Sequence, residues 1–475
     1  MRVLILHYRS APAKGLPKER ISIDLLDSAG TDGVSLEMSK RQVLLEAMGH
    51  KVAICSAYDW ADFPVPALEF ERGEVISMRV GLFGLGNGYF TSEVELKRVF
   101  RDSVLSLKSQ LAKVIDAFRP NLLFVHNVLS LPVHPAATVS LTELLRETQL
   151  PCAAIHHDIL SEGAYKFAPT CNFARSIIKE YFPPQMSNLR HWTINTRNKR
   201  ALEEKGVTAD VIHDTMDFDQ RLEDEERLRI RERLREKYGM KSSDVVLLVG
   251  ARLVPNKQTE LAGQLTAAMQ RLRPKLVGKN LYHGTVFPES GQIVLVLAGR
   301  PERDFGGYRD NLFEFFDTLK IPWKYVGNDV RPHRSEDEAL YALYPDMYAM
   351  ADFILYPTRW EGFGNQLLEA FAASLPVVVF EYPVFKEDIA PKGVRVVSLG
   401  DTIPKQRDHK GLVKLPVDTL ARVASQMATV LTSAEQYREI VTHNRLVGKK
   451  HFGFDALQAH LYEVVNWASS FSHKG

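Results

Sequence analysis

The chain has 475 residues, of which 45% are hydrophobic and 25% charged, a composition typical of a soluble globular protein with material for two domains. Its 60 basic and 58 acidic residues leave a formal net charge of +2, so no overall field draws it to nucleic acid. Three cysteines, Cys55, Cys152 and Cys171, show no CxxC spacing, which disfavours a disulfide framework or structural zinc site and indicates a reducing compartment.

No stretch of the sequence approaches the roughly 18 apolar residues that a membrane-spanning helix needs. The short apolar run within Met1–Arg9 predicts a buried strand rather than a signal peptide. We therefore expect a cytoplasmic enzyme that acts on small molecules, without a nucleic-acid partner or a transmembrane segment. A peripheral membrane contact stays open.

Short apolar runs alternate with helical patterns along the first half of the chain, which is typical of a parallel α/β architecture. A long polar loop follows the first run, and helical patterns lie at about 35–48, before 118 and at 140–148. The predicted strands of this half are 3–6, 51–55, 122–126, 152–155, 192–195 and 210–213.

The second half restarts the pattern with 244–250, a run too apolar to be anything but a central strand. A charged helix at 223–238 is interpreted as the connection between two domains. The further strands predicted here are 292–298, 323–326, 353–356 and 376–380. The domains expected from this division are 1–220, 221–445 and a C-terminal helix, 446–475, that is a candidate to cross back to the first domain.

The segment Glu361–Glu369, EGFGNQLLE, follows the strand that ends at Tyr356. Its two glycines permit a tight turn and close approach of a ligand. A helix starting near Asn365 would point its unpaired N–H groups and positive dipole end at that ligand. The two glutamates could then hold sugar hydroxyls and ribose while the helix end takes phosphates. The alternative is a buried glycine-rich turn with a capping glutamate.

The second candidate segment is Gly250–Lys257, again directly after a strand. Arg252 and Lys257 stand five residues apart across a proline-containing turn. Together they suit a diphosphate that must be neutralised as a sugar departs. The alternative is that both are solvated loop cations.

Both segments resemble motifs of a known enzyme family. EGFGNQLLEA, preceded by 344–348 and 351–352, resembles the signature of retaining GT-B glycosyltransferases, specifically glycosyltransferase family 4. ARLVPNK at 251–257 resembles the family's phosphate clamp, and 33–52 resembles its first loop and helix. The stretch 211–217 departs at 213–215 from the family's V-I-P-N-G-V-D. The resemblance implies an α/β fold of GT-B architecture, with two facing Rossmann-like domains, parallel sheets and an interdomain cleft.

The resemblance also implies roles. Glu361 would lie against the transferred hexose and stabilise positive charge at its anomeric carbon, while Arg252 and Lys257 take the diphosphate. Glu369 would bind the donor ribose, and Gly33 would let the first helix approach the phosphate. The donor-binding residues implied in this way are Glu369, Gly33, Phe363, Gly364, Asn365 and Gln366.

His156-His157-Asp158 matches the place where the family carries a histidine near the sugar. Neighbouring residues of an extended chain point to opposite sides, so we expect one histidine at the site and favour His157, followed by Asp158. The alternative is a histidine that is hydrogen-bonded at a domain surface.

By the same resemblance, transfer retains the anomeric configuration, and the departing phosphate takes the acceptor proton. No metal and no cofactor beyond the nucleotide-sugar substrate is then needed. The only DxD, Asp217–Asp219, is interpreted as a linker feature.

A basic loop after the first strand leads us to expect an anionic acceptor, such as a phosphorylated or glycerate-type glycoside. The segments 126–132 and 156–158 are similar to a branch of the family that acts on small soluble acceptors, glucosylglycerate-type solutes among them. The acceptor-binding candidates are Arg9, Lys14, Asp158 and Lys166, with Lys18, Arg20 and Arg175 as further nearby cations. One alternative is that these cations belong to a solvated loop without a role in binding. Another is that the acceptor is lipid-linked or a polysaccharide.

Rival activities on this architecture are a nucleotide-sugar epimerase, a phosphorylase with pyridoxal phosphate, and a nucleotide-binding regulator without turnover. A dinucleotide-dependent oxidoreductase is disfavoured because no G-x-G-x-x-G follows the first strand. The sequence leaves the donor open between UDP-glucose, GDP-mannose and other nucleotide sugars.

Overall fold

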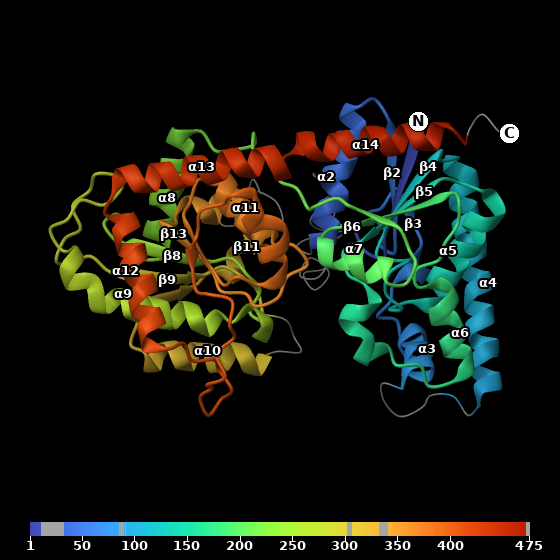
Figure 1. The fold of residues 1–475 in the computed structure, drawn as a ribbon, viewed down its shortest axis with the longest axis horizontal. Helices are drawn as coiled ribbons and strands as arrows, with labels where there is room; N and C mark the ends of the chain where they lie inside the picture. The colour runs from blue at the N-terminus through green and yellow to red at the C-terminus, as the bar shows by residue number, and fades with distance from the viewer. Residues whose placement is uncertain (11–32, 85–89, 91, 302–305, 332–340, 472–475) are drawn as a thin grey trace. The chain divides into compact units, whose positions relative to one another are not determined.

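The apolar runs form two parallel β-sheets in the computed structural model of the protein (Figure 1). The structure describes residues 1–471 except 11–32, 85–89, 91, 302–305 and 332–340. Two units divide the chain: Met1–Asp214 with Asp455–Gly475, and Thr215–Phe454. We call them the amino-terminal and the central unit. The candidate cations Lys14, Lys18 and Arg20 lie outside the described residues.

The amino-terminal unit contains a seven-stranded sheet in the order β3-β2-β1-β4-β5-β6-β7, with every neighbouring pair parallel. The strand order reverses between β1 and β4, so their carboxyl ends flank a switch point. Central strands β4 and β5 are buried along their whole length, which explains their continuous apolar sequences. The strands are β1 (Arg2–Leu6), β2 (Lys51–Ser56), β3 (Phe63–Pro64), β4 (Leu122–His126), β5 (Cys152–His156), β6 (Leu189–Thr193) and β7 (Ala209–Val211).

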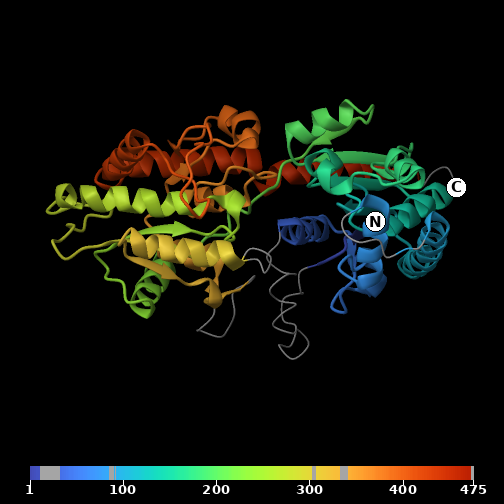
Figure 2. The same cartoon turned by 90° about the horizontal axis from the view of Figure 1, so that it is seen from below.

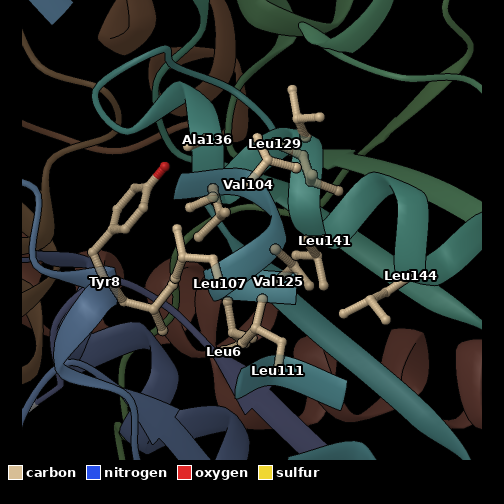
Figure 3. Close-up of a cluster of buried hydrophobic side chains, with 14 of the residues drawn as sticks. Leu6, Tyr8, Val104, Leu107, Leu111, Val125, Leu129, Ala136, Leu141 and Leu144 are labelled. Carbon is tan, nitrogen blue, oxygen red and sulfur yellow. The ribbon is translucent and has the colours of Figure 1, made fainter. Parts of the chain in front are cut away.

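Helices cover both faces of this sheet: α4 and α5 lie on one face, α2 and α7 on the other (Figure 1). The longest, α4, begins where the Ser92 hydroxyl accepts a hydrogen bond from the Glu95 amide at 3.2 Å, and it ends at Arg119 in the left-handed region. Leu107 and Leu111 of α4 pack against Leu6 and Val125 of the sheet (Figure 3).

The helices of this unit are α2 (Gly33–Ala47), η2 (Pro66–Leu68), α3 (Gly73–Phe83), α4 (Glu93–Phe118), α5 (Pro135–Thr148), η3 (Leu160–Phe167), α6 (Asn172–Tyr181), α7 (Thr196–Glu203) and α14 (Phe454–Ser469). The last helix of the chain thus belongs with the first strands in one unit.

The central unit contains a six-stranded sheet in the order β10-β9-β8-β13-β14-β15, again parallel throughout. Its order reverses between β8 and β13, which places a second switch point there. A short parallel pair, β11 with β12, lies apart from it. The strands are β8 (Val245–Val249), β9 (Ile293–Leu297), β10 (Trp323–Tyr325), β11 (Val330–Arg331), β12 (Tyr341–Ala342), β13 (Phe353–Tyr356), β14 (Val377–Val379) and β15 (Val397–Ser398).

Helices α9 and α10 of this unit run side by side (Figure 2). The helices here are α8 (Asp224–Lys237), η4 (Pro255–Lys257), α9 (Thr259–Leu276), α10 (Gly306–Thr318), η6 (Gly327–Asp329), η7 (Leu343–Met347), α11 (Asn365–Ala372), η8 (Phe385–Ile389), η9 (Ala390–Lys392), α12 (Val417–Leu431) and α13 (Ala434–Phe452). Among the described residues, no helix has an apolar stretch long enough to cross a bilayer.

The charged helix α8, interpreted from the sequence as the connection between two domains, packs within the central unit. It is part of the central unit, because Arg231 and Arg235 both donate to the buried carboxylate of Asp352, at 2.5 and 2.7 Å. The charges of α8 therefore include a buried ion-pair network with Asp352.

Candidate active site

The two segments singled out in the second half of the sequence meet at the switch point of the central sheet. Strands β8 and β13 are paired, so the turns after them leave the same edge. Gln366 Nε2 donates to the carbonyl of Gly250 at 2.9 Å, and the Arg359 amide donates to the carbonyl of Asn256 at 3.0 Å. In open α/β sheets this edge is where ligands bind.

An ion pair joins the two turns, because the Lys257 ammonium contacts the Glu361 carboxylate. The side chains are 8% and 18% exposed, so the pair is shielded on most sides but reachable. Tyr356, the last residue of β13, donates its hydroxyl to the same carboxylate oxygen at 2.6 Å. Glu361 is thereby fixed between a cation and a phenol.

Burial, followed by the charge of Glu361, raises the pKa of Tyr356 well above its ordinary value. The same two causes raise the pKa of Tyr382. Both phenols therefore stay protonated and act as donors. Tyr382 donates to the carbonyl of Phe363 at 2.6 Å, which holds the glycine-rich turn in place.

Gly364 is the residue that this turn requires. Its φ is +130°, and a Cβ there would collide with the hydroxyl oxygen of Tyr382. It is also the N-cap of α11 and has no side chain with which to accept a hydrogen bond from the first helical N–H groups. The helix therefore begins without a side-chain cap, as an anion-binding helix terminus does.

Glu369 lies just over one turn into α11 and is held by Tyr348, whose hydroxyl donates to Glu369 Oε2 at 2.8 Å. Burial, followed by the charge of Glu369, raises the pKa of Tyr348. The Phe363 ring is buried against Phe452, so only its backbone is available to a ligand. Arg252 is exposed on the turn after β8.

The candidate histidines of the amino-terminal unit fall on opposite sides of β5, as expected for neighbouring residues of a strand. His157 Nε2 lies 3.0 Å from His126 Nδ1, and its Nδ1 lies 3.8 Å from Asp214. His156 instead bonds His191 at 2.9 Å. Burial, followed by the nearby charge of Arg41, lowers the pKa of His157 well below its ordinary value, so the ring is neutral.

Asp158 is fixed by Asn127, a residue that the sequence did not single out. Asn127 Nδ2 donates to Asp158 Oδ2 at 3.0 Å, while its Oδ1 accepts from the amides of His157 and Asp158. Asn127 has φ +57°, a conformation that asparagine tolerates.

Arg9, an acceptor-binding candidate, is already paired with other side chains in the structure. Its guanidinium pairs with Glu69 at 3.2 Å and Glu71 at 2.7 Å and lies 4.3 Å from the ring centroid of Phe70. Two carboxylates already neutralise it. Lys166 is exposed at the end of η3, and Gly33 is the exposed first residue of α2.

The DxD motif forms a turn. Asp217 Oδ1 accepts from the Asp219 amide at 3.0 Å, and Asp219 pairs with Lys449 at 2.6 Å. In the part of the chain that the structure describes, no group of three or more His, Cys, Asp or Glu side chains is arranged to hold a metal ion.

Comparison with known proteins agrees with this geometry. The family model for glycosyl transferases group 1 matches residues 230–398, which contain both turns of the candidate site. The chain is 30% identical over 464 residues to mannosylglucosylglycerate synthase of Thermotoga maritima, covering 96% of this chain and 98% of that protein. It is also 30% identical over 430 residues to the Petrotoga mobilis enzyme of the same name, covering 89% and 95%.

Among solved structures, sucrose-phosphate synthase of Thermosynechococcus elongatus shares the fold, with a TM-score of 0.59, 14% identity and 99% of each chain covered. The two parallel α/β units and the site at the central switch point define a glycosyltransferase of GT-B architecture. The relatives that match almost the whole chain then identify its family. The chain belongs to the group 1 family of glycosyl transferases.

Proposed function

We propose that the protein transfers a mannosyl unit from a nucleotide-linked donor to a hydroxyl of a glucosylglycerate-type acceptor. The observation that carries this proposal is the similarity along almost the whole chain to two enzymes named mannosylglucosylglycerate synthase. Such an acceptor is small and bears one carboxylate. It fits the expectation of an anionic glycoside.

The donor diphosphate would lie at the edge where β8 and β13 end. Arg252 and Lys257 supply positive charge from one turn, and the uncapped start of α11 supplies N–H donors from the other. Glu369, held by Tyr348, would accept hydrogen bonds from ribose hydroxyls. Such an arrangement compensates the diphosphate without a metal ion, which is how we propose the reaction runs.

The Lys257–Glu361 pair links donor binding to chemistry. When Lys257 turns to the diphosphate, Glu361 loses its counter-charge but keeps the hydrogen bond from Tyr356. Its negative charge is then available to the anomeric carbon, where positive charge develops as the leaving group departs. Tyr356 keeps the carboxylate in place during this exchange.

We propose further that transfer retains the anomeric configuration and that the departing phosphate takes the acceptor proton. His157 suits a role beside the hexose, because a neutral ring offers a hydrogen bond without adding charge. The thiols Cys55, Cys152 and Cys171 are all unpaired, which supports a place in the reducing cytoplasm.

Product analysis tests the proposal. The protein is incubated with GDP-mannose, UDP-mannose or UDP-glucose and with glucosylglycerate, neutral glucosylglycerol or a lipid-linked sugar, with and without EDTA. We expect a mannosylated glucosylglycerate with the donor's anomeric configuration by NMR, at a rate that EDTA leaves unchanged. Transfer to the lipid-linked sugar alone, or free sugar in every mixture, would overturn the proposal.

A further inference from the structure

Helix α2 carries a buried ion pair in the amino-terminal unit, one turn apart on the same face. Arg41 Nη1 donates to Glu37 Oε2 at 2.8 Å and to the Glu37 carbonyl at 3.1 Å. Lys40 Nζ donates to the other oxygen, Glu37 Oε1, at 2.5 Å. The side chains of Glu37 and Arg41 are both 0% exposed. One carboxylate thus accepts hydrogen bonds from two cations.

The other edge of the Arg41 guanidinium is unused. Its Nε and Nη2 atoms are buried and have no hydrogen-bond partner among the described residues. Unpaired donors on a buried charged group are costly to the fold. Nε and Nη2 also form an edge with two parallel N–H bonds, and a carboxylate can accept both at once. The vacant edge therefore has the donor geometry of a carboxylate-binding group.

Histidines surround this guanidinium. His126, the last residue of β4, uses Nδ1 in its contact with His157, while its Nε2 is buried without a hydrogen-bond partner among the described residues. Burial first, and then the charge of Arg41, lower the pKa of both rings. Arg41 therefore lies close to both rings, and both rings are neutral.

We infer that the Nε–Nη2 edge of Arg41 binds the carboxylate of the acceptor, an inference that rests on the proposed function. Arg9 is the weaker candidate because Glu69 and Glu71 already occupy it. Arg41 stands beside His157, so a glycerate held there keeps its sugar near that ring. Both nitrogens are closed off from solvent, so a carboxylate reaches them only if neighbouring side chains at this edge move.

The test compares an acidic acceptor with its neutral analogue. Initial rates with glucosylglycerate and with glucosylglycerol are measured for the wild type, Arg41→Gln and Arg41→Lys. Arg146→Gln is the matched control, since it makes the same change on α5, where Arg146 pairs with Glu180 at 3.0 Å. Thermal unfolding reports whether each variant folds, and calorimetry with the nucleoside diphosphate reports the donor site.

We expect Arg41→Gln to raise the KM for glucosylglycerate by about 10- to 100-fold, the loss of one charge-assisted contact. The KM for glucosylglycerol and the affinity for the nucleoside diphosphate should change less than twofold. Arg41→Lys keeps the charge but not the paired donors, so its KM for glucosylglycerate should lie between those of the wild type and Arg41→Gln.

If Arg41→Gln raised the KM for both acceptors by the same factor, the preference for the acidic acceptor would be unchanged. Arg41 would then have a structural role, and this inference would be overturned while the proposed function stood. If Arg41→Gln does not fold, the test uses Arg41→Lys instead and compares its KM for glucosylglycerate with its KM for glucosylglycerol. A wild-type enzyme that transfers to neither acceptor would overturn the proposed function as well.

Discussion

The ammonium of Lys257 rests against the carboxylate of Glu361, and the two come from turns that follow neighbouring parallel strands, β8 and β13. The pair is shielded yet reachable, and Tyr356 holds the carboxylate independently of the lysine. A phosphate can therefore draw the lysine away without releasing Glu361. We therefore propose that the ion pair is a resting state of the donor site rather than a structural bridge.

Replacing Lys257 should weaken donor binding. We expect Lys257→Met to lower the affinity for the nucleoside diphosphate about 10- to 100-fold, because a charge-assisted contact to phosphate is lost. Calorimetry checks this, with Lys275→Met at the far end of α9 as the control. Unchanged affinity in Lys257→Met would show that the lysine serves only Glu361.

The phenol of Tyr348 should matter through Glu369. Tyr348→Phe removes the 2.8 Å hydrogen bond and leaves Glu369 free to turn, so we expect a severalfold rise in donor KM with little change in kcat. Steady-state kinetics measures both constants. Were kcat to fall while KM stayed constant, the assignment of Glu369 to the donor ribose would be wrong.

A side chain at position 364 should destabilise the central unit. Gly364→Ala meets both the strain of φ +130° and a collision with Tyr382, whereas Gly393→Ala meets only the strain of φ +89° in open space. We expect Gly364→Ala to lose about 1–3 kcal/mol in chemical denaturation and Gly393→Ala clearly less. Equal losses would mean that the contact with Tyr382 is unimportant.

The meeting of the two turns at one sheet edge could be predicted from the sequence because glycine spacing and apolar runs are local signals. The contacts that hold the residues of this edge in place could not be predicted. Tyr348, Tyr356 and Tyr382 have the sequence context of core residues, and their hydroxyl partners are known only once the turns are placed. The strands of both sheets were also predictable except for the two-residue edge strands β3 and β15, and the helices α3 and α6 were missed.

Ion pairs between residues far apart in the sequence could not be predicted. Arg9 meets carboxylates some sixty residues away, and Arg231 and Arg235 of α8 meet Asp352 more than a hundred residues away. Arg41 was overlooked for a different reason: its partner Glu37 is only four residues away, but a charged residue in a helix is ordinarily solvated. Composition gives no sign of which charges a fold will bury.

The network around Asp352 should anchor α8. Although burial opposes it, Arg231 and Arg235 hold the pKa of Asp352 well below its usual range. Asp352→Asn leaves two arginines unpaired, and we expect a loss of about 3–5 kcal/mol in chemical denaturation. The control is Asp401→Asn, which breaks the exposed pair with Lys386 and should leave the unfolding midpoint unchanged. A similar midpoint for both variants would contradict the anchoring role.

Buried histidines should make the fold acid-sensitive. Burial lowers the pKa of His134 and of His191 to about 4, below the value of about 6.5 in an unfolded chain. The unfolded state therefore binds more protons between these values, so stability falls as pH drops from about 6.5 to 4, by up to about 1.4 kcal/mol per pH unit for each ring. In thermal unfolding across this range, the stability of His191→Asn should fall less steeply with decreasing pH than that of the wild type. A slope equal to that of the wild type would refute the assignment.

The most direct measurement follows nucleoside diphosphate release from GDP-mannose, with UDP-linked hexoses beside it, in the presence and absence of glucosylglycerate. For the wild type, release should rise at least tenfold with the acceptor present, and Glu361→Gln should abolish the rise. Release at the same rate without an acceptor, or an undiminished rate in Glu361→Gln, would contradict a transferase whose donor site lies where β8 and β13 end.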